Sequence, residues 1–149
     1  MPLLVIRAIA AAALALAPTA LAGQATGPRT VAIGQTVSGT LRRGDAVLTA
    51  DSTYAQQWTL DGLAGQIVTI DVASDAFDAY VFVSGPGIGR DLPQDDDSGG
   101  HCNARLTVRL PGTGAYHIAV TSREKFATGP FTLSVTLGPR PVSLARCDR

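Results

Sequence analysis

Acidic side chains form the densest group of residues in this sequence that could do chemistry. Asp91, Asp95, Asp96 and Asp97 follow one another closely, and Asp78 comes shortly before them. Carboxylate oxygens gathered in a flexible loop favour Ca²⁺, which takes about six to eight oxygen ligands. We therefore predict a calcium site at Asp78, Asp95, Asp96 and Asp97, and Ca²⁺ is the one cofactor that the sequence suggests. A solvated acidic loop with Asx turns is the alternative.

A serine next to this acidic group raises the question of catalysis. The segment Asp97–Gly100 resembles the loop around the nucleophile of chymotrypsin-like proteases. That chemistry needs a base within reach of the serine and a carboxylate that orients the base. In those proteases the histidine precedes the serine, whereas His101 and His117 both follow Ser98. We therefore predict that the chain is not an enzyme, that it has no catalytic residue, and that this segment is a glycine-rich turn.

Two aromatic residues suggest a binding surface. Tyr80 and Phe82 alternate with Ala79, Val81 and Val83, which are expected core positions of one strand. Successive side chains of a strand point to opposite faces, so both rings should lie on the outer face. Paired rings on a sheet surface suit a sugar ring or a peptide. We predict a ligand surface at Tyr80 and Phe82; the alternative is that a loop or the C-terminal tail covers them.

The N-terminus predicts export. Arg7 is followed by the uncharged apolar run Ala8–Ala17 and by the small-x-small ending Ala20-Leu21-Ala22. This pattern is typical of a secretory signal peptide, so we predict a signal peptide over residues 1–22 and a periplasmic or secreted product. The apolar run is too short to cross a hydrocarbon core of about 30 Å. We therefore expect no membrane insertion after cleavage.

An exported chain matures in an oxidising compartment, and this one has two cysteines, Cys102 and Cys147. An even number of cysteines in that setting indicates a disulfide. The Cys102–Cys147 bond would close a loop of about 45 residues, stabilise the fold by about 4 kcal/mol and pin the tail, residues 139–149, onto the domain. Two free thiols that bind a metal are the alternative, although their spacing matches no zinc pattern.

The net charge of the chain bears on its possible partners, and its length bears on the number of domains. The 149 residues include 12 basic and 12 acidic side chains, so the net charge is zero. A chain of this kind has no electrostatic field for a phosphate backbone, and we expect no nucleic-acid partner. The length that remains after the signal peptide fits one domain.

Period-two alternation of apolar residues, broken by Gly, Pro, Asn and Asp, predicts strands throughout the mature chain. We expect about eight strands, over residues 31–41, 46–48, 54–60, 68–72, 79–83, 106–110, 116–120 and 131–137. Residues 85–100 are expected to form a long polar loop, and Trp58 to lie in the core. Strands at this spacing predict an all-β, antiparallel, jelly-roll-like β-sandwich over residues 23–138.

The order of these signals resembles the bacterial pre-peptidase C-terminal domain. The segments that carry the resemblance are Gly34–Leu41, Tyr54 with Trp58, Ala64–Val72, Phe77–Val83, Gly85-Pro86, Asp95–Gly99, Leu110–Val120 and Gly129–Val135. The resemblance implies a jelly-roll-like β-sandwich, which in the family usually follows the catalytic domain of a secreted peptidase. It also implies a role in secretion or in binding extracellular matrix or polymers.

Two functions remain in view at this point. The first is a standalone exported, non-catalytic module that assists secretion or binds an extracellular protein or polymer. The second is a regulatory partner, either an inhibitor or a chaperone, of an exported peptidase. A copy of a usually tethered domain that acts in trans on an enzyme would fit the second function.

Overall fold

The computed structural model describes residues 28–149, so the predicted signal peptide lies outside the described residues. Nine strands are present in this part of the chain. They are β1 (Thr36–Leu41), β2 (Ala46–Leu48), β3 (Thr53–Gly62), β4 (Ile67–Ala73), β5 (Ala79–Ser84), β6 (Gln94–Asp95), β7 (Ala104–Arg109), β8 (Gly114–Ser122) and β9 (Gly129–Leu137). Among residues 28–149, no helix has the length and apolar character needed to cross a membrane.

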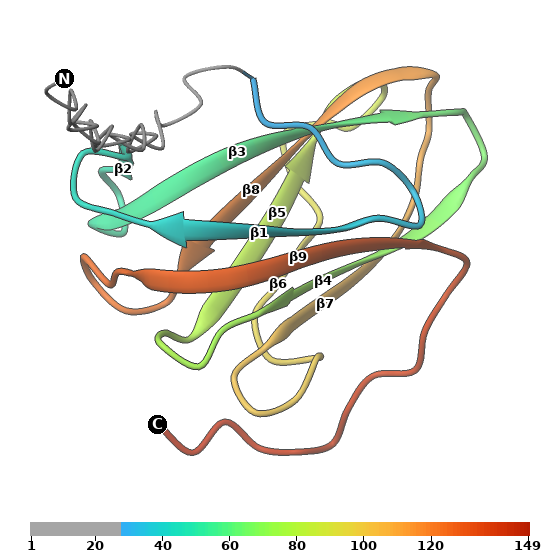
Figure 1. Ribbon diagram of the computed structural model, residues 1–149. Helices are drawn as coiled ribbons and strands as arrows, with labels where there is room; N and C mark the ends of the chain where they lie inside the picture. Colours follow the sequence, from blue (N-terminus) through green and yellow to red (C-terminus); the bar gives the residue numbers. More distant parts are fainter. Residues whose placement is uncertain (1–27) are drawn as a thin grey trace, which may run out of the picture.

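The strands form two facing antiparallel sheets, seen as two layers in Figure 1. One sheet has four strands in the order β1-β9-β4-β7, and the other has five in the order β2-β3-β8-β5-β6. Non-consecutive neighbours such as β9 and β4 show that the chain crosses repeatedly between the sheets. The predicted all-β sandwich is confirmed.

Alternating apolar side chains from both sheets fill the space between the layers. In β4 the side chains of Val68, Ile70 and Val72 are fully buried, because every second residue of the strand faces the opposite sheet. Trp58 also lies in this core, as predicted, with 7% of its surface exposed. The ring of Phe131 packs edge-on against Trp58, with 6.5 Å between the ring centroids. The core therefore ties the two sheets together through aromatic as well as aliphatic contacts.

A glycine allows the edge strand β1 to lie against this aromatic group. A Cβ atom at Gly39 would lie 2.3 Å from Cζ of Phe131, which is far closer than two carbons can approach. Gly39 is paired with Phe131 across β1 and β9. The missing side chain at Gly39 therefore leaves the room that the Phe131 ring occupies.

The structure departs from the sequence expectations at two places. The expected polar loop, residues 85–100, contains the short strand β6, which pairs with β5. The first expected strand begins at Thr36 and not at Val31. Thr30 instead forms an isolated parallel bridge with Thr59 of β3, and Val31 is buried beside it.

Candidate functional site

The two predicted surface aromatics form the floor of a groove on the outer face of the five-stranded sheet. Alternate residues of β5 are buried, and Tyr80 and Phe82 occupy the half-exposed positions between them. Their ring centroids are 6.1 Å apart, and the ring planes are tilted by 55°. On the neighbouring strand β8, Tyr80 lies opposite Thr121 and Phe82 lies opposite Ala119. The rings are therefore the largest side chains at these paired positions of the floor.

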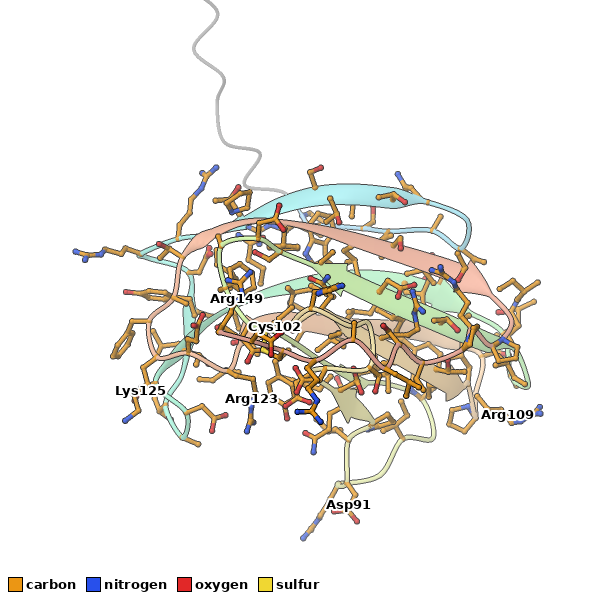
Figure 2. All side chains as sticks on the ribbon, turned by 90° about the horizontal axis from the view of Figure 1, so that it is seen from below. Asp91, Cys102, Arg109, Arg123, Lys125 and Arg149 are labelled. Carbon is orange, nitrogen blue, oxygen red and sulfur yellow. A yellow bond between two sulfur atoms is a disulfide. The ribbon has the colours of Figure 1, made fainter. Side chains whose placement is uncertain are left out.

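Two loops that are distant in sequence form the walls of this groove, which has a volume of about 640 Å³. One wall comes from β2 and the turn after it, including Val47 and residues 48–51. The other comes from the β5–β6 connection, residues 90–92, together with Gln94. In Figure 2, Asp91 lies at the tip of this connection, which projects beyond the sandwich. We refer to this feature as the aromatic groove.

Polar contacts fix the position of the Tyr80 ring. Its hydroxyl donates a hydrogen bond to Oε1 of Gln94 on β6. The guanidinium carbon of Arg123 lies 5.3 Å from the ring centroid, a cation–π contact. Burial raises the pKa of Tyr80; the positive charge of Arg123 opposes this effect, and the carboxylates of Asp51 and Asp96 add to it. Tyr80 therefore remains a neutral hydroxyl donor at physiological pH.

The predicted calcium ligands lie near one another but do not form a single ligand set. Asp95 accepts hydrogen bonds from the backbone N–H of Ser98 (3.0 Å), the hydroxyl of Ser98 (2.5 Å) and the backbone N–H of Arg105 (2.8 Å). Asp96 forms an ion pair with Arg123 at 3.3 Å. The Asp95 carboxylate thus holds its own loop together. Binding of Ca²⁺ by the rest of the set stays a prediction.

Asp78, directly before β5, has the most perturbed carboxyl group of the described residues. Burial raises its pKa to about 6, and the negative charges of Asp97, Asp96 and Glu124 add to the effect, while Arg123 opposes it. Its Oδ1 atom is buried without a hydrogen-bond partner. Ionised Asp78 is therefore disfavoured by both desolvation and repulsion.

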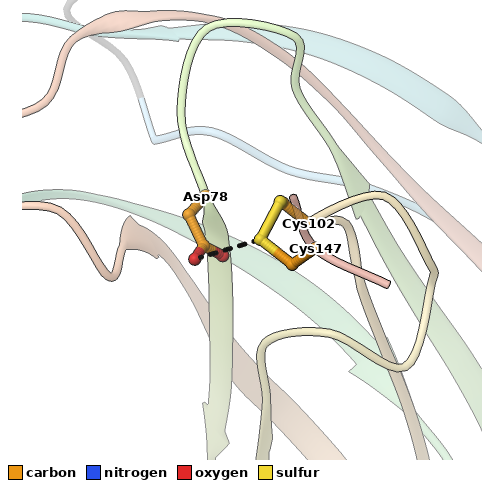
Figure 3. Close-up of side chains that lie close together, drawn as sticks. All are labelled: Asp78, Cys102 and Cys147. Carbon is orange, nitrogen blue, oxygen red and sulfur yellow. Dashed lines mark hydrogen bonds between the residues drawn. A yellow bond between two sulfur atoms is a disulfide. The ribbon is translucent and has the colours of Figure 1, made fainter. Parts of the chain in front are cut away.

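The disulfide predicted between Cys102 and Cys147 is present and lies beside Asp78 (Figure 3). Oδ2 of Asp78 is 3.7 Å from Sγ of Cys147. Because a disulfide sulfur carries no hydrogen, only the protonated carboxyl can donate to it. Within residues 28–149, the one group of potential metal-ligand atoms that lie within 4.8 Å of one another is Asp78, Cys102 and Cys147. Its sulfurs are bonded to each other, so this group is not a metal site.

The disulfide is one of several ties that hold the C-terminal tail. Arg140 pairs with Asp71 of β4 at 2.6 Å, and Arg105 donates to the carbonyl oxygen of Pro141 at 2.7 Å. The backbone N–H of Ser143 donates to the carbonyl oxygen of Ser98 at 2.8 Å. These contacts hold the tail against the domain. No tail residue lines the aromatic groove, so the tail does not cover Tyr80 and Phe82.

Ser98 and the two histidines, His101 and His117, have different contacts and do not contact one another through any hydrogen bond among the described residues. Ser98 donates to Asp95, as described above. His117 contacts the side chain of Gln57 at 3.1 Å on the outer face of the five-stranded sheet. His101 is exposed in the turn that leads to Cys102. The contacts of Ser98 are those of the Asx-type turn expected from its sequence.

Sequence reasoning missed most of the groove walls and the cation above Tyr80. Val47 was expected only as part of a short strand, and Asp51 and Arg123 were not assigned to a site. No local pattern marks these residues, because Val47 and Asp51 come from β2 and the turn after it, and Arg123 reaches the Tyr80 ring from the β8–β9 connection. Only Tyr80 and Phe82 carried a signal, since alternation in one strand determines where their side chains point.

Comparisons with known proteins give a similarity of fold. No protein-family model matches the sequence, and no curated protein gives a significant match to it. The pre-peptidase C-terminal domain of a collagenase from Bacillus anthracis superposes with a TM-score of 0.55 at 15% identity, over 74% of this chain and 95% of that chain.

Two further structures superpose less closely. They are PliG of Aeromonas hydrophila and PliG of Salmonella Typhimurium, both periplasmic inhibitors of g-type lysozyme. Each has a TM-score of 0.49, with identities of 19% and 17%, and each match covers 75% of this chain and 100% of the other. The described chain shares the β-sandwich fold of the collagenase domain, which is the fold that the sequence resemblance predicted.

Proposed function

We propose that this chain is an exported, non-catalytic binding module that contacts an extracellular protein or polymer through the aromatic groove. The observation that carries the proposal is the pair of half-exposed rings, Tyr80 and Phe82, at the floor of a groove of about 640 Å³. Binding sites of this kind combine apolar floors with a few polar groups that fix orientation. The predicted signal peptide and the Cys102–Cys147 disulfide support export.

The fold supports a passive role for the scaffold. Tyr80 and Phe82 project from an inner strand of the five-stranded sheet, because β5 is paired with β8 on one side and with the two-residue strand β6 on the other. Rings held on a paired strand change position little when a ligand arrives, so less free energy is spent on ordering them. A rigid display surface is suited to recognition.

The test is retention of the purified protein on defined insoluble probes: chitin, peptidoglycan and beads that carry acidic or basic polypeptides. We expect the wild-type protein to be retained on at least one probe. The variant with Tyr80→Ala and Phe82→Ala should lose that retention, because truncation of two anchoring rings typically costs about 2 kcal/mol or more each.

The matched control is Thr107→Ala, an exposed side chain on β7 of the other sheet. Thermal melts should show all three proteins folded. Retention of the ring variant at the wild-type level, or retention of wild type on none of the probes, contradicts the proposal.

A further inference from the structure

The apolar surface of the aromatic groove continues around the edge of the sheet. Val47 lines the groove and is 45% exposed. It pairs across β2 and β3 with Tyr54, whose ring centroid lies 5.6 Å from that of Phe126. Phe126, in the β8–β9 connection, is 54% exposed. Exposed apolar side chains that adjoin in this way mark interaction surfaces more often than isolated ones do.

The backbone holds Phe126 in this exposed position at a cost. Its φ is 52°, and the φ of Ser52 is 58°, so two residues with side chains adopt the left-handed region. That region is unfavourable for a bulky residue and persists only when surrounding contacts hold it. The backbone N–H of Phe126 donates to the carbonyl oxygen of Ser52 at 2.9 Å. The two strained residues thus support each other beside the groove.

The rings are poorly arranged for stacking against a sugar. A sugar ring binds by lying flat on an open aromatic face. One face of Tyr80 is occupied by Arg123, whose guanidinium carbon is 5.3 Å from the ring centroid. The ring of Phe82 is tilted by 55° to that of Tyr80, so the pair makes no flat platform. A tilted pair of this kind suits contact with a branched or aromatic side chain better than with a flat sugar ring.

The electrostatic surroundings of the groove are acidic. Asp51 and Asp91 are exposed on opposite walls, and neither forms an ion pair among the described residues. Arg123 is already paired with Asp96. Among the residues that line the groove, Arg90 is the one cation, so the lining carries one more negative than positive charge; Lys125, next to Phe126 in the chain, lies outside this lining. Since the net charge of the whole chain is zero, this acidic excess is local and gives the groove a preference for cationic partners.

We propose that the aromatic groove binds a basic polypeptide segment, which packs an apolar side chain against the exposed surfaces of Tyr80 and Phe82 and places lysine or arginine beside Asp51 and Asp91. This inference rests on the proposed function and specifies its partner. The side chains of Val47 and Phe126 extend the contact for a partner that reaches past the edge of the sheet.

Two labelled peptides of equal length, with leucine and phenylalanine at the same positions, test the proposal by fluorescence anisotropy. The charged positions are lysine in one peptide and glutamate in the other. We expect the lysine peptide to bind and the glutamate peptide to bind at least about tenfold more weakly. Added salt should weaken the lysine complex, because the exposed charges are screened.

Variants locate the interaction. Asp51→Asn combined with Asp91→Asn should weaken binding of the lysine peptide about tenfold, while Phe82→Ala should remove it. Asp61→Asn is the matched control, since Asp61 is an exposed carboxylate at the opposite end of β3, and it should leave binding unchanged.

Equal binding of the two peptides, or of the wild-type protein and the double aspartate variant, overturns the inference. If the peptides do not bind while chitin is retained through Tyr80 and Phe82, the inference fails and the proposed function stands. If no probe depends on Tyr80 and Phe82, both fail.

Discussion

At the scale of single residues, Asp78 links the fold to pH. Its pKa in the folded protein, about 6, is above the ordinary value of 3.8. Between these values the folded state binds more protons than the unfolded state, so the contribution of Asp78 to stability falls as pH rises. This contribution is fully present below about pH 4 and is lost above about pH 6.

Asp78→Asn should therefore raise the melting temperature at about pH 7, because it removes the desolvation cost of the ionised carboxylate and its repulsion by Asp97, Asp96 and Glu124. At about pH 4, where Asp78 is protonated in the folded wild-type protein, the two proteins should melt at similar temperatures. Melting curves from pH 4 to pH 7 provide the measurement, and the low-pH curves serve as the internal control. A lower melting temperature for the variant at pH 7 would show that the ionised carboxylate is stabilising.

Calcium offers a second way to relieve the same repulsion. We predict that Ca²⁺ raises the melting temperature at about pH 7 through Asp78, Asp96 and Asp97, and that Asp78→Asn reduces the shift. Asp95 is left out of this set because it already accepts three hydrogen bonds within its loop. Identical melting curves with calcium and with a chelator would remove the prediction.

At the scale of elements, the disulfide and the tail form one structural unit. Cys102 and Cys147 are separated by 45 positions in the chain. The variant with Cys102→Ser and Cys147→Ser should lose about 2 to 4 kcal/mol of unfolding free energy, mainly because the unfolded chain is no longer constrained. Chemical denaturation measures the loss, and limited proteolysis should show faster cleavage in residues 139–149.

Arg140→Ala is the matched control for this change. This substitution removes only the ion pair between Arg140 and Asp71, and the Arg140 side chain is 45% exposed. The loss of unfolding free energy should therefore stay below about 1 kcal/mol. If the control destabilises the protein as much as the loss of both cysteines, the ion pair and not the disulfide holds the tail.

The elements also show what the sequence could reveal. Alternation over 79–83 placed Tyr80 and Phe82 outside and Val81 inside, because the period of a strand determines the direction of each side chain. It could not reveal β6. A pair of residues, Gln94 and Asp95, has no measurable period, and it becomes a strand only because β5 lies beside it.

At the scale of the whole molecule, the fold class was predictable and the site was not. Eight alternating segments require two facing sheets to bury their apolar faces. The order of strands in those sheets depends on long-range pairing, such as that of β1 with β9. The aromatic groove forms where the turn after β2 and the β5–β6 connection meet, so its walls depend on that order and not on a local pattern.

The edges of the two sheets have a consequence for self-association. The five-stranded sheet ends in β2 and β6, which are three and two residues long. The other sheet ends in β1 and β7, and a side chain from the five-stranded sheet contacts each of them. The backbone N–H of Arg105 in β7 donates to Asp95, and Gln56 donates to the carbonyl oxygen of Thr40 in β1 at 2.6 Å. Each of these contacts occupies one main-chain group on the free edge of its strand, and short edge strands limit pairing with another copy. Val47 and Phe126 are thus displayed to solvent next to a sheet whose short edges, β2 and β6, give another copy little backbone to pair with.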